Sequence, residues 1–578
     1  MEDNIEDDVE DINLYQDETN NNAPFQIIRN ILVGKTTSDP FCEEISNKRT
    51  KKHIGNYILN ALKSNPSFIG QIDAETGKEV TFEEMREKSV KCALWLKKQH
   101  ICRNNVITVC TMNQLNAYVP LLAGLYIGCK VNPLDEYHVK ENLDYFLKKV
   151  KPKVIFTSAS FAMATLQFAF EVKSNCKSAS LPKIIVFDHH EVFESLHSIL
   201  NYQSFNENAV NNFSCPLISI RETAMILFSS GTDSLPKDVD IPQSVFMAPS
   251  NQQAPFMSCN DIGLWFESFG FITGMFLTVR AITSHVTAIK VKPMFHASKV
   301  CKLIEKYKVT WMFLKTDMCT ELVKSIDLTK YNVSSLKKFL FGGSIINHGI
   351  HANLIKLLPN ASVIQIYNLT ETGIIAYQRR TGKIGSSGYV GENVRLMITS
   401  LYPSAKEKPL GPNMRGQIWC RSPYMMRKYY SDTSSVNYCE EWITNWFKTG
   451  DVGYYDEDGN VFVTERINQI FKYKKKTISP VEIEAVLQNH SAVLEAVVVP
   501  MPHAFENKYP KAFILKVPGK EVTEEELEQW VMEKLGPDKE LYGGVIFLNR
   551  MPRISNGKIQ RKILNYWAQA DAYDKNYA

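Results

Sequence analysis

The chain contains 578 residues, of which 44% are hydrophobic and 22% are charged. This composition is typical of a globular protein of about three or four packed units, and it excludes a collagenous, coiled-coil or largely disordered chain. The 66 basic and 62 acidic residues leave a net charge of +4, which gives no indication of nucleic-acid binding.

Residues 1–24 are acidic and rich in asparagine, and we interpret them as a disordered, solvated tail. An acidic start differs from the basic and then apolar start of a secretory signal or a mitochondrial presequence, so we expect a protein that is not secreted. The 12 cysteines form no CxxC pair, which indicates neither a zinc site nor a redox motif and fits a reducing compartment.

Helices and strands are expected to alternate in the first part of the chain. A capping box, Thr81 with Glu84, predicts the start of an amphipathic helix that continues to Lys98. The next predicted elements are a strand at 106–111, helices at 117–127 and 141–150, a strand at 154–157, a helix at 161–173 and a strand at 184–188. The longest apolar stretch, 117–129, is too short to cross a bilayer. This alternation predicts crossover connections and a parallel sheet.

A second alternating block covers 271–365 and ends in a predicted strand at 362–365. Short apolar runs between Gly, Pro and Asp then predict a β-rich layer at 385–463. The overall expectation is an α/β fold, in which parallel sheets and this β-rich layer are followed by a small α+β unit.

The small unit is expected to begin with a helix whose start is well marked. Ser479 is the predicted N-cap, Pro480 the first helical residue, and Glu482 completes a capping box. A second capping box, Thr523 with Glu526, predicts a later helix in the same unit.

The segment from Met225 to Lys237 leads from an apolar strand into small hydroxylated residues, a glycine and a lysine. Such a loop presents backbone N–H groups, hydroxyls and a cation together, which is how proteins hold phosphate groups. The candidate phosphate-binding residues are Ser229, Ser230, Gly231, Thr232 and Lys237. The spacing is not that of a P-loop, and a polar surface turn explains this segment equally well if it is taken alone.

Four further motifs follow: Gln365–Thr372, Lys448–Asp451, Glu465–Arg466 and Ser555–Ile559. In this order and at these separations, the motifs resemble those of the adenylate-forming superfamily, which contains acyl-CoA synthetases, coumarate-CoA ligases, beetle luciferases and peptide-synthetase adenylation domains. The resemblance covers about 25–570. It implies an AMP-binding N-terminal domain at 25–464 and a small, mobile C-terminal domain at 465–578, with Glu465 in the place of the hinge residue.

The resemblance also implies the reaction. ATP, with Mg²⁺, activates a carboxylic acid to an acyl-adenylate and releases pyrophosphate, and coenzyme A then takes the acyl group. Negative charge builds up at the α-phosphate in the first step, so the chemistry needs a preorganised cation and backbone donors. By its motif, Lys558 would be this catalytic cation, and Lys472 would belong to a second face of the small domain that serves thioester formation.

The remaining roles follow from the same resemblance. Thr370 would bind phosphate, and Glu371 would hold Mg²⁺, a hard cation that prefers oxygen ligands. The residues that would hold the nucleotide are Tyr367 stacked on adenine, Asp451 at the ribose hydroxyls, Arg466 beside it, and Gly343 and Ser344 between adenine and the acyl group.

The phosphate loop departs from the usual form, SSGTTGxPKG, at three positions. Asp233 replaces Thr, and Ser234 and Asp238 replace Gly, which is used there for positive φ and close backbone approach. A carboxylate ~5 Å from a phosphate oxygen repels it by roughly 3 kcal/mol at an effective dielectric near 20. Asp233 could avoid this repulsion by binding Mg²⁺ or by turning into water. Further departures are Asn368 for Gly, Gln243 for His and Gln417 for Glu.

Two functions stay open. The first is an ATP-dependent acyl-CoA synthetase that acts on a fatty or related aromatic acid; its acyl site would be lined by Phe269, Phe271, Ile272, Met275 and Phe276. The alternative is a catalytically impaired pseudoenzyme that binds a ligand or regulates another protein. Light emission is not expected, because 266–274 lacks the histidine of luciferases. The expected partner is a small carboxylic acid and not nucleic acid.

The resemblance also bears on location. Relatives often end in a peroxisomal Ser-Lys-Leu type tripeptide, whereas this sequence ends in Asn576-Tyr577-Ala578. A peroxisomal and a cytosolic location therefore both stay open.

Overall fold

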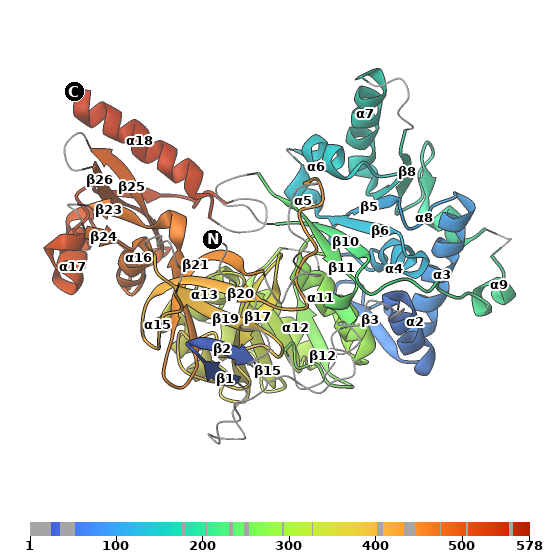
Figure 1. Ribbon diagram of the computed structural model, residues 1–578, viewed down its shortest axis with the longest axis horizontal. Coiled ribbons are helices and arrows are strands. Elements are labelled where there is room, and N and C mark those ends of the chain that lie inside the picture. Colours follow the sequence, from blue (N-terminus) through green and yellow to red (C-terminus); the bar gives the residue numbers. More distant parts are fainter. Residues whose placement is uncertain are drawn as a thin grey trace, which may run out of the picture.

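The computed structural model describes residues 25–34, 53–140, 142–175, 181–202, 205–229, 235–247, 254–291, 294–325, 327–401, 408–432, 438, 445–473, 476–503, 507–553 and 559–577. The predicted tail at 1–24, the inner residues of the phosphate loop at 230–234 and Lys558 lie outside the described residues. Three sheets with their covering helices form the large part of the molecule, and a smaller unit from the end of the chain lies beside them (Figure 1).

The first sheet has seven strands and is parallel except at one edge, where β11 runs antiparallel to β10. In order across the sheet, its strands are β11 (Asp238–Pro242), β10 (Thr223–Phe228), β6 (Lys130–Leu134), β5 (Val106–Cys110), β7 (Val154–Thr157), β8 (Lys183–Val186) and β9 (Glu194–Ser195). The parallel sheet predicted from the alternating pattern is therefore confirmed.

The second sheet has nine strands, with a parallel centre and antiparallel edges. Its strands are, in order, β18 (Tyr389–Val390), β17 (Gly373–Tyr377), β16 (Ser362–Leu369), β15 (Lys338–Gly342), β14 (Trp311–Lys315), β12 (Ile262–Trp265), β13 (Thr287–Lys290), β3 (Ile69–Asp73) and β4 (Glu79–Thr81). β16 extends four residues beyond the predicted end at Gln365, so Tyr367 and Asn368 belong to the strand itself.

The predicted β-rich layer is an antiparallel sheet of six strands. Its strands are β1 (Phe25–Ile28), β2 (Ile31–Gly34), β19 (Arg395–Thr399), β20 (Gly416–Arg421), β21 (Phe447–Tyr455) and β22 (Val461–Arg466). One hydrophobic core joins this layer to the seven-stranded sheet through four helices, α2 (Ile54–Ser64), α3 (Phe82–Lys98), α4 (Tyr118–Ile127) and α11 (Ile272–Thr283). All ten residues of α4 are buried in it, which accounts for the apolar stretch that is too short for a membrane.

The helices of the large part cover the sheet faces (Figure 1). They are α2 (Ile54–Ser64), α3 (Phe82–Lys98), α4 (Tyr118–Ile127), α5 (Glu136–Val139), α6 (Leu143–Val150), α7 (Ala159–Asn175), α8 (Leu196–Leu200), α9 (Glu207–Asn211), α10 (Ser244–Met247), α11 (Ile272–Thr283), α12 (Ala297–Tyr307), α13 (Thr316–Lys324), α14 (Asp327–Lys330) and α15 (His348–Leu357). No helix in the described part of the chain is both long and apolar enough to span a bilayer.

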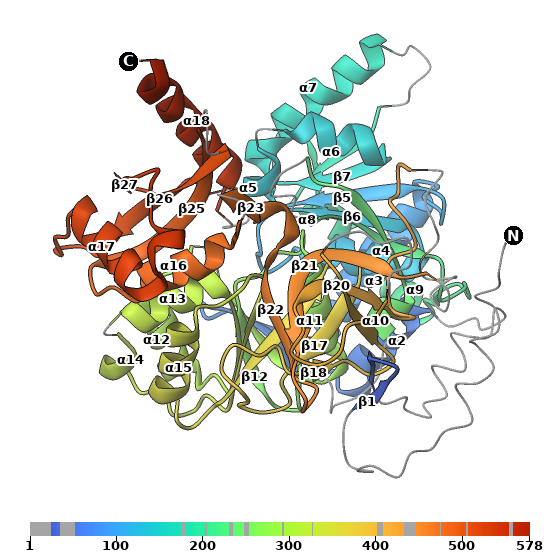
Figure 2. The same cartoon turned by 60° about the vertical axis from the view of Figure 1, so that its left-hand side comes forward.

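The C-terminal unit is a small α+β structure with its own core. Its elements are β23 (Phe471–Tyr473), β24 (Lys476–Ile478), α16 (Pro480–Gln488), β25 (Val493–His503), β26 (Asn507–Lys516), α17 (Glu524–Leu535), β27 (Val545–Leu548) and α18 (Arg561–Tyr577). Figure 2 shows α16 next to α13 of the large part. The Lys324 ammonium of α13 donates to the carbonyls of Val493 and Leu494 at 2.7 and 2.8 Å.

Two of the three predicted capping boxes form. Thr81 with Glu84 and Thr523 with Glu526 make both reciprocal hydrogen bonds. The third does not form: Ser479 is the N-cap of α16, but its side chain makes no capping bond, and the Glu482 carboxylate pairs with Lys539 instead. Lys539, 57 positions away in the sequence, therefore pairs with Glu482 in place of the backbone N–H of Ser479.

This difference can be measured. Thr523→Ala removes an N-cap hydrogen bond, so the free energy of opening the first turn of α17 should fall by about 1 kcal/mol. Ser479→Ala removes no such bond, so the opening free energy of α16 should fall by only a few tenths of a kcal/mol. Amide hydrogen exchange at the start of each helix measures both effects in one sample. Equal changes in the two helices would contradict the assigned caps.

Candidate active site

Five of the predicted site residues lie where the parallel strands β15 and β16 of the nine-stranded sheet end: Gly343, Ser344, Tyr367, Thr370 and Glu371. β15 and β16 are parallel neighbours with Gly342 opposite Ile366, so Gly343 and Tyr367 follow at the same level. Thr370 and Glu371 occupy the turn between β16 and β17. The carboxyl ends of parallel strands form a common edge, and loops at this edge are the usual place for ligand sites in α/β folds.

A buried carboxylate connects this edge to the six-stranded sheet. The Tyr367 hydroxyl donates to Asp451 Oδ2 at 2.6 Å, and Arg466 Nε lies 2.9 Å from Asp451 Oδ1. Asp451 on β21 is directly opposite Arg466 on β22, and the residue is 4% exposed. The structure therefore brings Tyr367, Asp451 and Arg466 together, and the three side chains fix one another's position.

The chemistry of this network is set by burial. Burial first, and then the Asp451 charge, raise the pKa of Tyr367 well above its usual range, so its hydroxyl stays protonated and serves as a donor. Gly450 precedes Asp451 in β21 at φ +74°, and an added Cβ there would lie 3.3 Å from Arg466 Nη1. Any other residue at this position would therefore strain the backbone and crowd Arg466.

The Gly343–Ser344 strip is exposed, and hydrogen bonds from Thr316 hold its backbone in place. Gly343 has φ +94°, and the nearest atom to an added Cβ is Lys315 Cγ at 4.0 Å, so a flat surface lies in front of it. The Thr316 hydroxyl hydrogen-bonds the carbonyls of Gly342 and Ser344 at 3.2 and 2.9 Å. Sequence reasoning did not find Thr316, because a single threonine at a helix start carries no distinctive pattern.

Glu371 and Lys237 are connected through one tyrosine. The Tyr429 hydroxyl hydrogen-bonds the Glu371 side chain, and burial together with that carboxylate raises the pKa of Tyr429. The Lys237 ammonium lies 4.8 Å from the centre of the same ring. The predicted metal ligand, Glu371, and the predicted loop cation, Lys237, therefore both contact Tyr429.

The residues at Glu371 fit Mg²⁺. Within the described residues no group of three or more His, Cys, Asp or Glu side chains could hold a metal ion. One carboxylate is nevertheless sufficient for Mg²⁺, which is commonly held by one or two carboxylates together with substrate phosphates.

The mouth of the phosphate loop is closed by two hydrogen bonds. Ser229 N donates to the Lys237 carbonyl at 2.8 Å, and Lys237 N donates to Ser229 Oγ at 3.2 Å. Asp238 does not lie in the loop: it is 2% exposed in β11 and accepts hydrogen bonds from Ser431 N and Oγ at 2.9 and 3.0 Å. Asp238 therefore serves as an acceptor within the sheet, at a strand position that needs no positive φ. Ser230, Gly231, Thr232, Asp233 and Ser234 lie outside the described residues.

Of the two C-terminal candidates, the one that the structure describes, Lys472, is not assembled with this site. Lys472 is exposed on β23, in the hairpin with β24, and none of its described contacts is with the residues above. Lys558 lies outside the described residues. Glu465, in the predicted hinge position, is fully buried in β22 and forms an ion pair with Arg415.

One ion pair at the site was missed. Glu267, 5% exposed, lies 3.2 Å from the Lys315 ammonium, which also covers the ring of Phe271 at 4.7 Å. Glu267 follows the carboxyl end of β12, and Lys315 is the last residue of β14, next to Gly343. They are 48 positions apart, so only the sheet order could have revealed the pair.

An apolar cavity of about 80 Å³ lies between β16, β17 and α11. Ile272 and Phe276 line it, as expected. The other three predicted lining residues do not: Phe269 and Met275 are buried in the main core, and Phe271 lies against Lys315. Of these three, Met275 lies on α11, whereas Phe269 and Phe271 precede the helix.

The central network yields a prediction. Tyr367→Phe leaves the buried Asp451 without its hydroxyl donor and should destabilise the large domain by about 1–3 kcal/mol, measured by urea unfolding. Tyr454→Phe is the control, because this ring stacks on Phe462 at 4.8 Å and its hydroxyl has no hydrogen-bond partner among the described residues. Similar losses in both variants would show that the Tyr367 hydroxyl is not important.

Comparisons with known proteins agree with this geometry. The family model of the AMP-binding enzyme matches residues 60–430, and that of the AMP-binding enzyme C-terminal domain matches residues 482–558. A luciferin 4-monooxygenase of Photuris pensylvanica is 28% identical over 93% of this chain and 97% of its own length. A probable 4-coumarate–CoA ligase of Dictyostelium discoideum is 28% identical over 89% of this chain and 95% of its own length.

A solved structure supports the fold. An anthranilate CoA ligase in complex with anthranoyl-AMP has a TM-score of 0.80 at 18% identity, and the match covers 92% of this chain and 99% of that one. Since the first family model alone matches more than half of the chain, the resemblance found in the motifs is confirmed. The chain belongs to the AMP-binding enzyme family of adenylate-forming ligases.

Proposed function

We propose that this protein is an ATP-dependent acid–thiol ligase, which converts a carboxylic acid to an acyl-adenylate and transfers the acyl group to coenzyme A. The observation that carries the proposal is the Tyr367–Asp451–Arg466 network beside the open Gly343–Ser344 strip. A fixed, buried carboxylate suits the paired hydroxyls of a ribose, and the strip leaves room for a flat base and an acyl group.

The proposed roles follow from position. Asp451 accepts from the ribose hydroxyls, while Arg466 and the Tyr367 hydroxyl hold it in place and the Tyr367 ring borders the adenine. Thr370, Ser229, Ser230, Gly231, Thr232 and Lys237 bind phosphates, and Glu371 holds Mg²⁺, which neutralises phosphate charge when bound. Lys558 supplies the cation of the adenylation step, and Lys472 serves thioester formation. The proposal also includes the division into an N-terminal domain at 25–464 and a mobile C-terminal domain at 465–578.

The cavity favours a compact acid. An apolar cavity of about 150 Å³ accommodates benzene, so a cavity of about 80 Å³ receives only a small apolar group unless its walls move. A medium or long fatty chain needs more room. We therefore place a small aromatic or short acyl acid before a fatty acid, and the relative that carries anthranoyl-AMP supports an aromatic ring at this place.

A catalytically impaired protein of the same fold is the second candidate. Asp233 and Ser234 favour it, because a carboxylate in the phosphate loop opposes the triphosphate. Asp238 no longer supports it, since its carboxylate is engaged by Ser431. The same experiment distinguishes the two functions.

Acid-dependent pyrophosphate release from Mg-ATP tests the activity. With benzoates, hydroxycinnamates and fatty acids as a panel, the natural chain should release pyrophosphate, and Lys558→Ala should lower the rate by about 100-fold or more through loss of charge stabilisation. Lys562→Ala, which removes an exposed cation four residues away, is the control and should keep the rate.

A loop variant separates the alternatives. Asp233→Thr with Ser234→Gly restores the usual loop, and Asp238 is kept because it holds Ser431. A silent natural chain that becomes active in this variant would establish the impaired protein. Silence of both chains with every acid would contradict the ligase.

The cavity size gives a second prediction. Phe276→Ala enlarges the cavity and should raise kcat/KM for octanoate relative to benzoate by roughly tenfold, because each added methylene then finds apolar contact. Phe170→Ala, at an exposed position on α7, is the matched control. An unchanged ratio in Phe276→Ala would show that the acid binds elsewhere.

A further inference from the structure

A second cavity, of about 660 Å³, lies at the opposite edge of the seven-stranded sheet from the phosphate loop. β5, β6, β7 and β10 begin at this edge, and their first residues or the residues just before them line the cavity. Ser229 follows the other end of β10, which is six residues or about 20 Å away. The cavity is therefore separate from the candidate active site.

The charge of this cavity is one-sided. Its cationic lining residues are Lys130, Lys148, Lys149, Lys151, Lys153, Arg427 and Lys428. Of the lining residues that the structure describes, Asp240 is the one with a carboxylate. Six excess positive charges thus surround one cavity in a chain whose net charge is +4. A concave, like-charged surface concentrates anions because its field lines converge.

Neutral groups hold several of these cations in place. The Lys149 ammonium donates to Ser431 Oγ at 2.8 Å, and the Lys130 ammonium lies 5.0 Å from the centre of the Tyr430 ring. Such contacts orient an ammonium group without cancelling its charge. Arg427 faces Asp240 at 3.5 Å, so the one carboxylate of the lining is already engaged.

We propose that this cavity binds a small polyanion with several phosphate groups. Lysine ammonium groups act as point charges for phosphate, and the Asn104 and Asn105 side-chain amides can donate further hydrogen bonds. The volume lies within the range of about 300–1,000 Å³ that is usual for small-molecule sites. Closely spaced phosphates occur on free polyphosphorylated compounds and on phosphoinositide head groups, and this chemistry is shared by both sources.

The proposal does not depend on the ligase activity, because no cavity residue belongs to the candidate active site. Binding of inositol hexakisphosphate to the full chain by titration calorimetry tests it. The natural chain should bind one equivalent, with an affinity that falls as salt is raised. The triple variant Lys149→Gln, Lys151→Gln, Lys428→Gln should bind roughly tenfold or more weakly, since three of the seven cations are lost.

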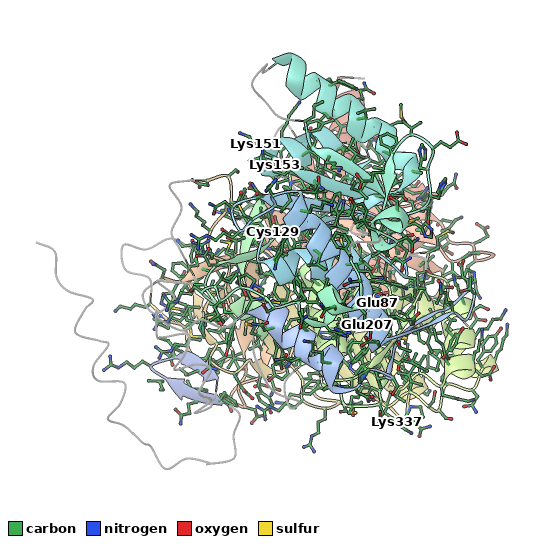
Figure 3. The ribbon with its side chains drawn as sticks, turned by 90° about the vertical axis from the view of Figure 1, so that its right-hand side faces the viewer. Glu87, Cys129, Lys151, Lys153, Glu207 and Lys337 are labelled. Atoms are coloured by element: carbon green, nitrogen blue, oxygen red, sulfur yellow. The ribbon has the colours of Figure 1, made fainter. Side chains whose placement is uncertain are left out.

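A charge-matched variant is the control. Lys302→Gln, Lys330→Gln, Lys337→Gln removes the same charge from lysines that do not line the cavity and should keep the affinity. Figure 3 shows Lys337 at the other end of the molecule from Lys151 and Lys153. Equal weakening in both triple variants would mean attraction by overall charge and would overturn the proposal. Thermal unfolding of each variant checks that the fold is kept.

Two further arms identify where and from what source the phosphates bind. If Lys237→Ala abolishes binding and the cavity variant keeps it, the probe occupies the phosphate loop and the proposal is wrong. Phosphatidylcholine vesicles with and without phosphatidylinositol bisphosphate complete the design. If the protein binds only the vesicles that contain phosphatidylinositol bisphosphate, and the cavity variant loses this binding, the source is a lipid head group. If the protein binds the free probe but no vesicle, the source is a free compound. No binding in either arm overturns the proposal.

Discussion

The Asp451 carboxylate is the point on which the site depends. A buried charge is costly unless it is paired and hydrogen-bonded, and Asp451 receives both a hydroxyl donor from Tyr367 and a cation from Arg466. These partners come from two different sheets, so satisfying one carboxylate also fixes the six-stranded layer against the end of β16. The same contacts hold the Asp451 carboxylate in a fixed position beside the Gly343–Ser344 strip. The interaction that joins the two sheets is therefore also the one that shapes the candidate site.

Several departures from the family pattern have acquired structural partners. Asp238 receives two hydrogen bonds from Ser431, and Gln243 accepts from the backbone N–H of Ile54 at 3.0 Å, where it caps α2 from a distance of 189 residues. The Asn368 amide donates to Thr273 Oγ1 at 3.1 Å and ties β16 to α11 beside the acyl cavity. These replacements fit the surrounding structure, so they do not indicate decay of the site. Asp233 and Ser234 are the departures that the proposed ligase activity has to accommodate.

Local patterns predicted local structure well. The capping boxes at Thr81 and Thr523 formed because both partners lie within one turn, and the order of helices and strands followed from periodicity. The box at Ser479 failed because Lys539 competes for Glu482, and the pair of Glu267 with Lys315 depends on sheet order. Motif order predicted three residues that the structure brings together, Tyr367, Asp451 and Arg466. The predicted lining agrees only in part with the apolar cavity, because tertiary packing decides which side chains reach it.

Binding of adenosine 5′-sulfamate most directly tests the central claim that the Asp451 network holds a nucleoside. This probe has no phosphate and no net charge, so it gives Asp233 no charge to repel and the basic cavity no charge to attract. We predict measurable binding by the natural chain and a loss of roughly tenfold or more in Asp451→Asn, because the amide group accepts less strongly and disrupts the pairing with Arg466 and Tyr367. Equal affinity in the two proteins would contradict the account.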